Sequence, residues 1–500
     1  MRRARALAMG GTDKIAKRRS QGVLNARERL ERLLDPNSFL ELGLFATSLR
    51  PELRERTPAD GKVTGFGRIA GREIAVAAND FTVLGASSTS VNGRKITHLK
   101  ELATKRGMPL VFLGESTGAR MPDIMGATGI GAGDRPTQFQ RKRETPWVSA
   151  ILGPAFGSSA WYSAMSDFVV MRKGAVMAVS SQRLASMATA EQVDGETLGG
   201  WHLHTEKSGL VDIAVDSDEQ AIDAIKRFLS YLPSHHNEAP PLAPVPPGSD
   251  EPIRRVLDVF PEGSNQVYDV RKIVNMIFDI GSVLELKARY GKPVTTALAR
   301  LNGRTVGVIA NNPLFKGGAI DIDACIKVTG FLVLCDSFNI PIVMLVDQPG
   351  LLIGVEGEMR GAPGRVINWM NALSLITVPK VSVILRKSYG QSMVNMGGAG
   401  NSDTVACWYT GEVSFMNPSF AVNIVHGVKE EDDPERFHTL LAEMNRDTTA
   451  YAMASNYSAH AVIDPRETRD YLVRTFEIDQ LRLSNGVGEH LMRTWPTSII

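Results

Sequence analysis

The feature that most constrains the fold is an internal repeat. Segment 67–80, GRIAGREIAVAAND, is similar to segment 299–312, ARLNGRTVGVIANN, which begins 232 residues later. Two further pairs of blocks repeat at nearly the same offset: 108–118 with 340–350, and 145–159 with 378–392. Because three blocks stay almost in register, we predict two homologous domains in one chain.

A proline-rich segment lies between the two copies. It reads SHHNEAPPLAPVPPGSDE, and five of its residues are prolines: 240, 241, 244, 246 and 247. Such a composition favours an extended, stiff chain. We therefore predict an N-terminal domain over residues 1–235, a linker over 236–252 and a C-terminal domain over 253–500.

Each copy alternates short apolar runs with helical patterns, which indicates an α/β fold whose parallel strands are covered by helices. The predicted strands are 73–78, 110–113, 148–152, 305–310, 342–346 and 381–385. The helices are predicted near 95–106 and 323–338. The glycine-rich sequence GFGRIAG (65–71) precedes a strand instead of following one, so we interpret it as part of a hairpin and not as a dinucleotide-binding turn.

Composition excludes several classes of protein. Lys plus Arg is 56 and Asp plus Glu is 54, so the net charge of +2 argues against a nucleic-acid partner. The three cysteines have no CxxC spacing, which argues against a zinc module and suits a reducing cytoplasm, where we expect the protein. The uncharged stretch 145–166 is too polar, and too often interrupted by Gly and Pro, to span a membrane.

The sequence GESTG (114–118) matches the G-x-S-x-G pattern of a nucleophile elbow, so a hydrolase using Ser116 is a rival hypothesis. The histidines that could complete a triad are His202, His204 and His426. However, the repeat partner of Ser116 is Gln348. Within this five-residue motif the two copies share only the final glycine, Gly118 and Gly350. The two histidines of WHLH (201–204) are better explained as packed side chains than as ligands, and we expect no metal site.

The third predicted strand of each copy ends in small residues, GPAFGSS (153–159) and RKSYGQS (386–392). Small residues let a backbone approach a ligand, and a following helix offers free N–H groups. Backbone donors of this kind can form an oxyanion hole without a catalytic side chain. Tight packing of strand against helix explains the same residues, but their recurrence at equivalent points of both copies favours a site.

Several longer stretches match one known family. They begin at residues 26, 61, 117, 166, 199, 228, 338 and 463: ARERLERLLD, GKVTGFGRIAGREIAVAANDFTVLGAS, TGAR, SDFVVM, GGWHLHTEKSG, FLSYLP, FNIPIVMLVDQPG and IDPRETR. From about Ala26 to Thr475 the chain resembles the carboxyltransferase (β) subunits of biotin-dependent acyl-CoA carboxylases, of the propionyl-CoA and methylcrotonyl-CoA type. The resemblance implies two tandem crotonase-like (ββα superhelix) domains and a homohexamer. Each active site would lie between the N-half of one subunit and the C-half of its neighbour.

The resemblance also implies a set of site residues. The hole for the thioester enolate falls at Gly157 and Ser158, and the hole for the biotin ureido oxygen falls at Gln391 and Ser392, after Gly390. Residues expected to face coenzyme A are Gly85, Ala86, Ser87, Gly118, Ala119 and Arg120. Residues expected on the biotin side are Phe315, Gly317, Gly318 and Gly350. The family often has Gly-Gly in the first hole and Gly-Gly-Ala in the second, so Ser158, Gln391 and Ser392 are departures.

These implications lead to one hypothesis, in which CO2 moves from carboxybiotin to the enolate of an acyl-CoA. We find no biotinylation sequence and no P-loop, so a biotin carboxylase/biotin carboxyl carrier partner is expected to bring the biotin. The alternatives are an acyl-CoA decarboxylase α subunit, the Ser116 hydrolase and a catalytically silent scaffold subunit. The sequence does not identify the acyl group.

Overall fold

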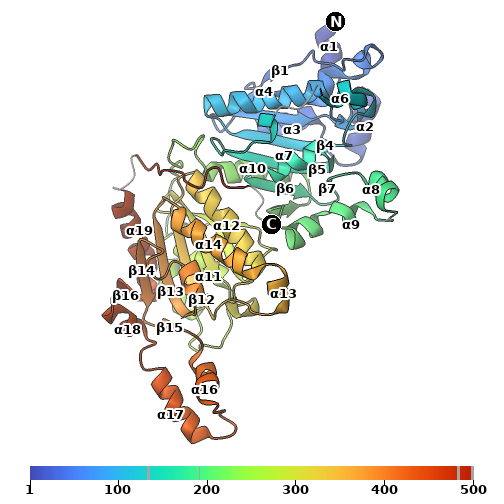
Figure 1. The fold of residues 1–500 in the computed structure, drawn as a ribbon. Coiled ribbons are helices and arrows are strands. Elements are labelled where there is room, and N and C mark those ends of the chain that lie inside the picture. The colour runs from blue at the N-terminus through green and yellow to red at the C-terminus, as the bar shows by residue number, and fades with distance from the viewer. Residues whose placement is uncertain (132–135, 191, 481–484, 497–500) are drawn as a thin grey trace. The chain divides into compact units, whose positions relative to one another are not determined.

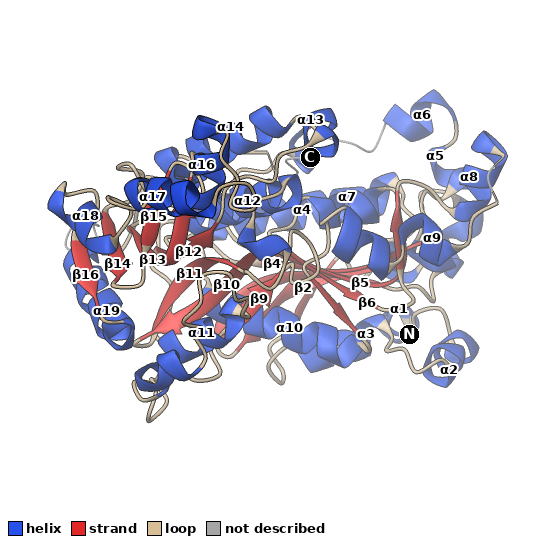
Figure 2. Cartoon of the chain, turned by 90° about the horizontal axis from the view of Figure 1, so that it is seen from below, coloured by secondary structure: helices blue, strands red, loops and turns tan. Residues whose placement is uncertain are grey.

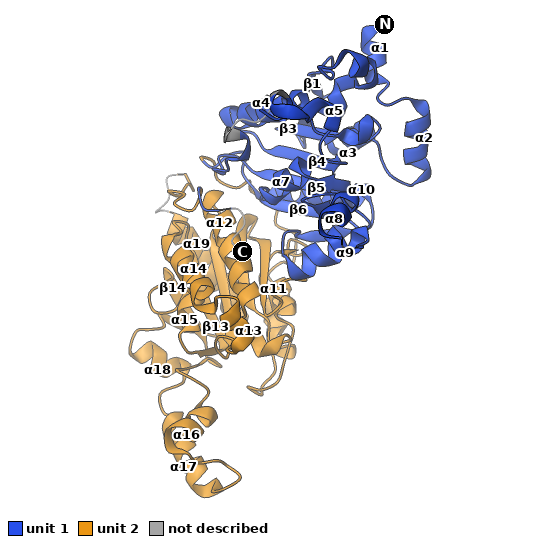
Figure 3. Cartoon of the chain, turned by 45° about the vertical axis from the view of Figure 1, so that its right-hand side comes forward, with its two compact units in different colours: residues 1–236, 494–498 blue, residues 237–493, 499–500 orange. Residues whose placement is uncertain are grey.

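The computed structural model describes residues 1–131, 136–190, 192–480 and 485–496 (Figure 1). The chain forms two compact units (Figure 3). Unit 1 comprises residues 1–236 together with C-terminal residues from 494, and unit 2 comprises residues 237–493. Each unit is built on one eight-stranded sheet. Among the described residues, no helix is both long and apolar enough to cross a membrane.

The sheet of unit 1 has the order β1-β2-β3-β4-β5-β6-β8, and β7 pairs with β5. The β1, β2 and β3 strands are antiparallel, and from β3 onward neighbouring strands are parallel. The strands are β1 (Leu40–Leu42), β2 (Lys62–Ile69), β3 (Arg72–Asn79), β4 (Leu110–Ser116), β5 (Trp147–Phe156), β6 (Phe168–Arg172), β7 (Val176–Ala178) and β8 (Ile213–Val215).

The sheet of unit 2 repeats this order, with β15 taking the place of β7. Its strands are β9 (Leu284–Leu286), β10 (Val294–Leu301), β11 (Arg304–Asn311), β12 (Ile342–Gln348), β13 (Lys380–Tyr389), β14 (Thr404–Trp408), β15 (Glu412–Ser414) and β16 (Ala461–Ile463). The predicted duplicated α/β architecture is therefore confirmed. Strands β4 and β5, and their unit 2 counterparts β12 and β13, extend beyond the predicted ranges, because their polar ends continue to pair within the sheet.

Helices cover both faces of the unit 1 sheet (Figure 2). The pair α4 and α7 covers one face, where Phe66, Ile96, Phe112, Trp147 and Tyr162 form part of a buried core, and α3 and α10 cover the other. The helices of unit 1 are α1 (Arg2–Leu7), α2 (Thr12–Ser20), α3 (Ala26–Leu33), α4 (Ser90–Arg106), α5 (Met121–Ile124), α6 (Gly126–Gly131), α7 (Ser158–Ala164), α8 (Gln182–Thr189), α9 (Gly195–Gly199) and α10 (Asp218–Tyr231).

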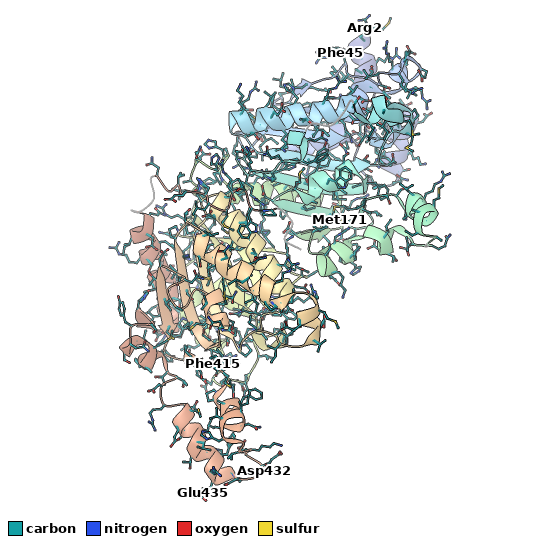
Figure 4. All side chains as sticks on the ribbon, viewed as in Figure 1. Arg2, Phe45, Met171, Phe415, Asp432 and Glu435 are labelled. Carbon is teal, nitrogen blue, oxygen red and sulfur yellow. The ribbon has the colours of Figure 1, made fainter. Side chains whose placement is uncertain are left out.

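Unit 2 is layered in the same way, with α12 and α14 on one face of its sheet and α11 and α19 on the other (Figure 2). The short helices α16 and α17 form a hairpin that projects from this unit, with Asp432 and Glu435 near its tip (Figure 4). The helices of unit 2 are α11 (Val270–Ile277), α12 (Ile322–Ser337), α13 (Val355–Met359), α14 (Ala362–Leu375), α15 (Ser392–Asn395), α16 (Pro418–His426), α17 (Pro434–Met444), α18 (Ala450–Ser455) and α19 (Thr468–Asp479).

The glycine-rich sequence 65–71 lies in the β2–β3 hairpin, whose turn is formed by Ala70 and Gly71, both with positive φ. The interpretation as a hairpin is therefore confirmed. In unit 2 the proline-rich segment is hydrogen-bonded to the equivalent β10–β11 turn: the Ala243 amide donates to the carbonyl of Gly303 at 2.9 Å. Prolines keep this segment extended, and the carbonyl of Pro241 accepts a hydrogen bond from the guanidinium of Arg300 on β10 at 3.0 Å.

The C-terminal residues return to unit 1. Arg143 lies in the segment before β5 and is buried. Its guanidinium donates to the carbonyl of Trp495 at 2.7 Å. The polypeptide therefore passes from unit 1 to unit 2 and back again.

Candidate active site

In unit 1, two loops at the carboxyl ends of β3 and β4 are joined by a short parallel bridge between Ser88 and Ala119. The Ser88 amide donates to the carbonyl of Gly118 at 2.8 Å, and the Arg120 amide donates to the carbonyl of Ser88 at 2.9 Å. Successive peptide groups of an extended chain point to opposite sides, so the Ala119 amide points away from Ser88. The bridge brings together the two loops that were expected to face coenzyme A.

The end of β5 supplies a second backbone donor. Gly157 has φ 61° and ψ −124°, a conformation that favours glycine. Its amide donates to the carbonyl of Val179 at 3.2 Å and is therefore engaged with the chain after β7. Ser158 begins α7, where helix geometry leaves the N–H without an internal partner. None of the hydrogen bonds found among the described residues uses the amide of Ser158 or of Ala119.

Ala119, Gly157 and Ser158 line one cavity of about 190 Å³. Its hydroxyl groups include those of Ser88 and Ser158, which lie 2.8 Å apart. The apolar lining residues are Ile96, Ile124, Ile130, Phe139 and Trp161. This volume is below the range of about 300–1,000 Å³ that is usual for pockets of drug-sized ligands.

Arg120 was expected to face coenzyme A, but its side chain is buried within unit 1. The guanidinium pairs with the carboxylate of Asp60 at 2.6 Å and donates to the Ser87 hydroxyl at 3.1 Å. Arg120 therefore ties the loop after β4 to the loop after β3. The part of this loop that lines the cavity is Ala119.

Unit 2 repeats the same backbone arrangement. The Ile320 amide donates to the carbonyl of Gly350 at 3.0 Å, and the Leu352 amide donates to the carbonyl of Ile320 at 2.8 Å. The residue between them, Leu351, thus occupies the position of Ala119. Gly390, with φ 68°, donates to the carbonyl of Ser414 at 2.9 Å, as Gly157 does to Val179.

Gln391 is therefore the first residue after β13 whose amide takes part in none of the hydrogen bonds found in the described chain. Sequence reasoning did not single out Leu351, and only the bridge geometry identifies its amide. The Ser392 side chain is buried, and its hydroxyl donates to Oε1 of Gln348 at 2.7 Å. Gln348 in turn donates to the carbonyl of Tyr389 at 3.1 Å, so Ser392 supports the end of β13 from within.

The remaining residues expected on the biotin side lie in the loop after β11. Phe315 precedes a 3₁₀ turn, Lys316–Gly318, and its ring lies 5.8 Å from the ammonium of Lys292. Gly317 has φ 64°. A side chain on Gly318 would meet the carbonyl of Asp347 at 2.5 Å, so this loop packs directly on the end of β12. The structure thus brings this loop to the strand end that precedes Gly350.

Two buried carboxylates lie at equivalent strand ends. Glu115 on β4 pairs with Arg18 at 2.6 Å and with Arg29 at 2.8 Å. Asp347 on β12 pairs with Arg386 at 3.0 Å and accepts a hydrogen bond from the Tyr268 hydroxyl at 2.8 Å. Because both carboxylates are already engaged, we assign neither of them the role of general base.

Ser116 does not have the surroundings of a nucleophile. The Ser116 side chain is buried. Its hydroxyl donates to the carbonyl of Ala86 at 3.1 Å and accepts a hydrogen bond from the Gly118 amide at 3.1 Å. None of the hydrogen bonds found for Ser116 in the described chain involves a histidine. His204 instead lies in a helical segment, bonded to the carbonyl of Met177 at 2.7 Å, and burial lowers its pKa. The triad of the rival hydrolase hypothesis is thus not assembled in this unit.

We predict that Ser116→Ala keeps the carboxyl-transfer activity that the family resemblance implies. The variant loses a buried hydroxyl that stabilises the loop, so stability should fall by about 1 kcal/mol with little change in kcat. The measurement pairs transfer kinetics with mass spectrometry of the protein after incubation with acyl-CoA. An acyl group attached to Ser116 in the unaltered chain would contradict this prediction.

The fold and its two amide-lined strand ends define an enzyme that can hold negative charge on oxygen with backbone donors. The family model of the carboxyl transferase domain matches residues 17–484. The chain is 36% identical over 481 residues to the methylmalonyl-CoA carboxyltransferase 12S subunit of Propionibacterium freudenreichii subsp. shermanii, covering 94% of this chain and 91% of that protein. It is 35% identical to the propionyl-CoA carboxylase beta chain of Roseobacter denitrificans, covering 95% and 94%.

A solved structure agrees with these relatives. The crystal structure of transcarboxylase 12S, a hexamer with methylmalonyl-coenzyme A and methylmalonic acid bound, superposes with a TM-score of 0.89 at 34% identity, covering 96% of this chain and 94% of that one. The chain therefore belongs to the carboxyl transferase family and is an enzyme that transfers carboxyl groups. The predicted crotonase-like fold is confirmed by the same match.

Proposed function

We propose that this chain is the carboxyltransferase subunit of a biotin-dependent acyl-CoA carboxylase. It would transfer CO2 from carboxybiotin, carried by a biotin carboxylase/biotin carboxyl carrier partner, to the enolate carbon of an acyl-CoA. The main support for the proposal is that one backbone arrangement occurs at the same strand ends of both units. In each, two loops are joined by a parallel bridge beside the N-terminus of a helix. Two reactants that each develop negative charge on a carbonyl oxygen need two such devices.

We assign the acyl-CoA to unit 1. The amides of Ala119 and Ser158 would donate to the thioester oxygen, and the cavity beside them would hold the acyl group. Biotin, when bound, supplies the carboxyl group, and the amides of Leu351 and Gln391 in unit 2 fit its ureido oxygen as two hydrogen-bond donors. Positioning and charge stabilisation by these four amides would account for catalysis without a general base from this chain, because the biotin nitrogen that gives up CO2 would accept the α-proton of the acyl-CoA.

We further propose that the enzyme works as a homohexamer in the cytoplasm, with each active site between unit 1 of one subunit and unit 2 of its neighbour. The hexameric transcarboxylase 12S, which this chain resembles over nearly its whole length, supports this assembly. A site shared between subunits also requires both units in every chain.

The reverse reaction tests the proposed function. Full-length protein, free biotin and malonyl-CoA or methylmalonyl-CoA should give slow, biotin-dependent loss of the carboxyl group from the CoA ester, followed by chromatography. Omission of biotin is the control. Loss of the carboxyl group at the same rate without biotin, or no reaction with any of the esters, would overturn the proposal.

A further inference from the structure

A lysine lies in the wall of the unit 1 cavity. Lys62 is the first residue of β2, and alternation along the strand puts its side chain on the same face as Phe66, which packs in the core beneath α4. The residue is only 2% exposed. The Lys62 side chain is therefore buried, and it lies beside the cavity that we assign to the acyl group.

In the described part of the chain, no carboxylate forms an ion pair with Lys62. An ammonium has three donors, and the one hydrogen bond found for it among the described residues goes to the carbonyl of Ala86, at 2.8 Å. The nearby carboxylate of Asp60 is taken by Arg120 at 2.6 Å and by the Thr89 hydroxyl, and no ion pair within 4.0 Å joins it to Lys62.

The charged groups that act on Lys62 are Asp60, Arg120 and Lys95, and only the first favours its charge. Burial outweighs them and lowers the pKa of Lys62 to about 7. Buried cations are ordinarily paired, so a ligand that brings an anion into this cavity would complete the site.

Gln138 provides a second polar group in the same cavity. The residue is 2% exposed and lines the space beside Tyr162, to whose hydroxyl its amide nitrogen donates. Its Oε1 atom is buried, and no hydrogen-bond partner for it is found among the residues that the structure describes. Buried polar atoms are nearly always paired in folded proteins, so this side of the cavity also has a hydrogen-bonding position to fill.

We propose that the cavity binds an acyl group whose far end carries a carboxylate, held by Lys62 directly and by Gln138 through a bridging water, so that the enzyme acts on CoA esters of short dicarboxylic acids. This inference rests on the proposed function, because it takes the cavity as the acyl site. The carboxylate would supply the missing counter-ion of Lys62, and a bridging water would donate one hydrogen bond to Oε1 of Gln138 and one to the carboxylate. A plain fatty acyl chain would leave both groups unpaired.

Binding separates this proposal from the carboxyl-transfer reaction itself. Calorimetry with the full-length chain compares succinyl-CoA with butyryl-CoA, which have equal numbers of acyl carbons. Succinyl-CoA should bind about tenfold more tightly at pH 6, as one charge-assisted bond allows. Since the ligand carboxylate favours protonated Lys62, this preference should fall by roughly threefold between pH 7 and pH 8, and butyryl-CoA should show no such change.

Variants then identify the residues. Lys62→Met should abolish the preference for succinyl-CoA and leave butyryl-CoA binding within about twofold, whereas Lys105→Met, at an exposed position of α4, should change neither. If Lys62→Met does not fold, Gln138→Leu and the pH profile of the unaltered chain provide the test. Equal binding of the two esters, or a preference independent of pH, overturns this inference alone. Failure to bind any CoA ester overturns the proposed function as well.

Discussion

Ser158→Pro should lower the rate of carboxyl transfer by about 10²–10³-fold, because it removes one of the two amide donors that we assign to the thioester oxygen. Proline is well tolerated at the first position of a helix, where the N–H has no internal partner. The preceding Gly157, at φ 61° and ψ −124°, lies near the mirror image of the extended conformation that precedes proline, which glycine adopts without strain. The measurement is kcat in the reverse assay, with circular dichroism to check the fold.

Ser158→Ala is the matched control. It retains the amide and removes only the hydroxyl that meets Ser88, so its rate should fall by less than about tenfold, the usual worth of one hydrogen bond. Equal losses in both variants would show that the hydroxyl, and not the backbone, carries the function. No loss in Ser158→Pro would contradict the assignment of this strand end to catalysis.

Arg386→Met should destabilise the β12–β13 region of unit 2 by about 3–5 kcal/mol, because it leaves Asp347 as an unpaired buried charge. The same guanidinium also donates to the carbonyls of Gly263 and Gln266, so a loop would lose its attachment to β13. Native-state hydrogen exchange of β12 and β13 amides is the measurement, since a chain of two units need not unfold in one step.

The pH dependence of this defect has a definite sign. Burial already raises the pKa of Asp347, and loss of Arg386 would raise it further. A carboxyl group whose pKa is raised by folding costs more stability as the pH rises, so the defect should be smaller at pH 5 than at pH 8.

Arg466→Met provides the comparison for Arg386→Met, because its pair with Asp464 at 2.6 Å is largely exposed. An exposed pair contributes at most about 1 kcal/mol, so this variant should be nearly silent. If Arg386→Met were equally silent, the buried pair would not be a determinant of the unit 2 strand ends.

The internal repeat explains why sequence reasoning located the strand ends of both units. Blocks that keep one offset must occupy the same place in two copies of a fold, and the glycines at 157 and 390 mark where each third strand turns into a helix. The helix after each turn then offers free amides by geometry alone. These arguments need only local spacing, and they predict the architecture correctly.

Contacts between distant residues could not be predicted in the same way. The amides of Gly157 and Gly390 donate to the carbonyls of Val179 and Ser414, and nothing in the sequence spacing indicates these partners. Arg120 was expected to face coenzyme A, but its guanidinium forms a buried ion pair with Asp60, 60 positions earlier in the sequence. Sequence reasoning did not single out Lys62, and its burial follows from the position of its side chain on β2.

The contact between Arg143 and the carbonyl of Trp495 has a consequence for limited proteolysis. Because Trp495 is hydrogen-bonded to the first unit, a single cleavage in the stretch around residue 245 would not release two independent fragments. The C-terminal piece would stay anchored through its own tail, and only trimming of that tail as well would let the pieces part.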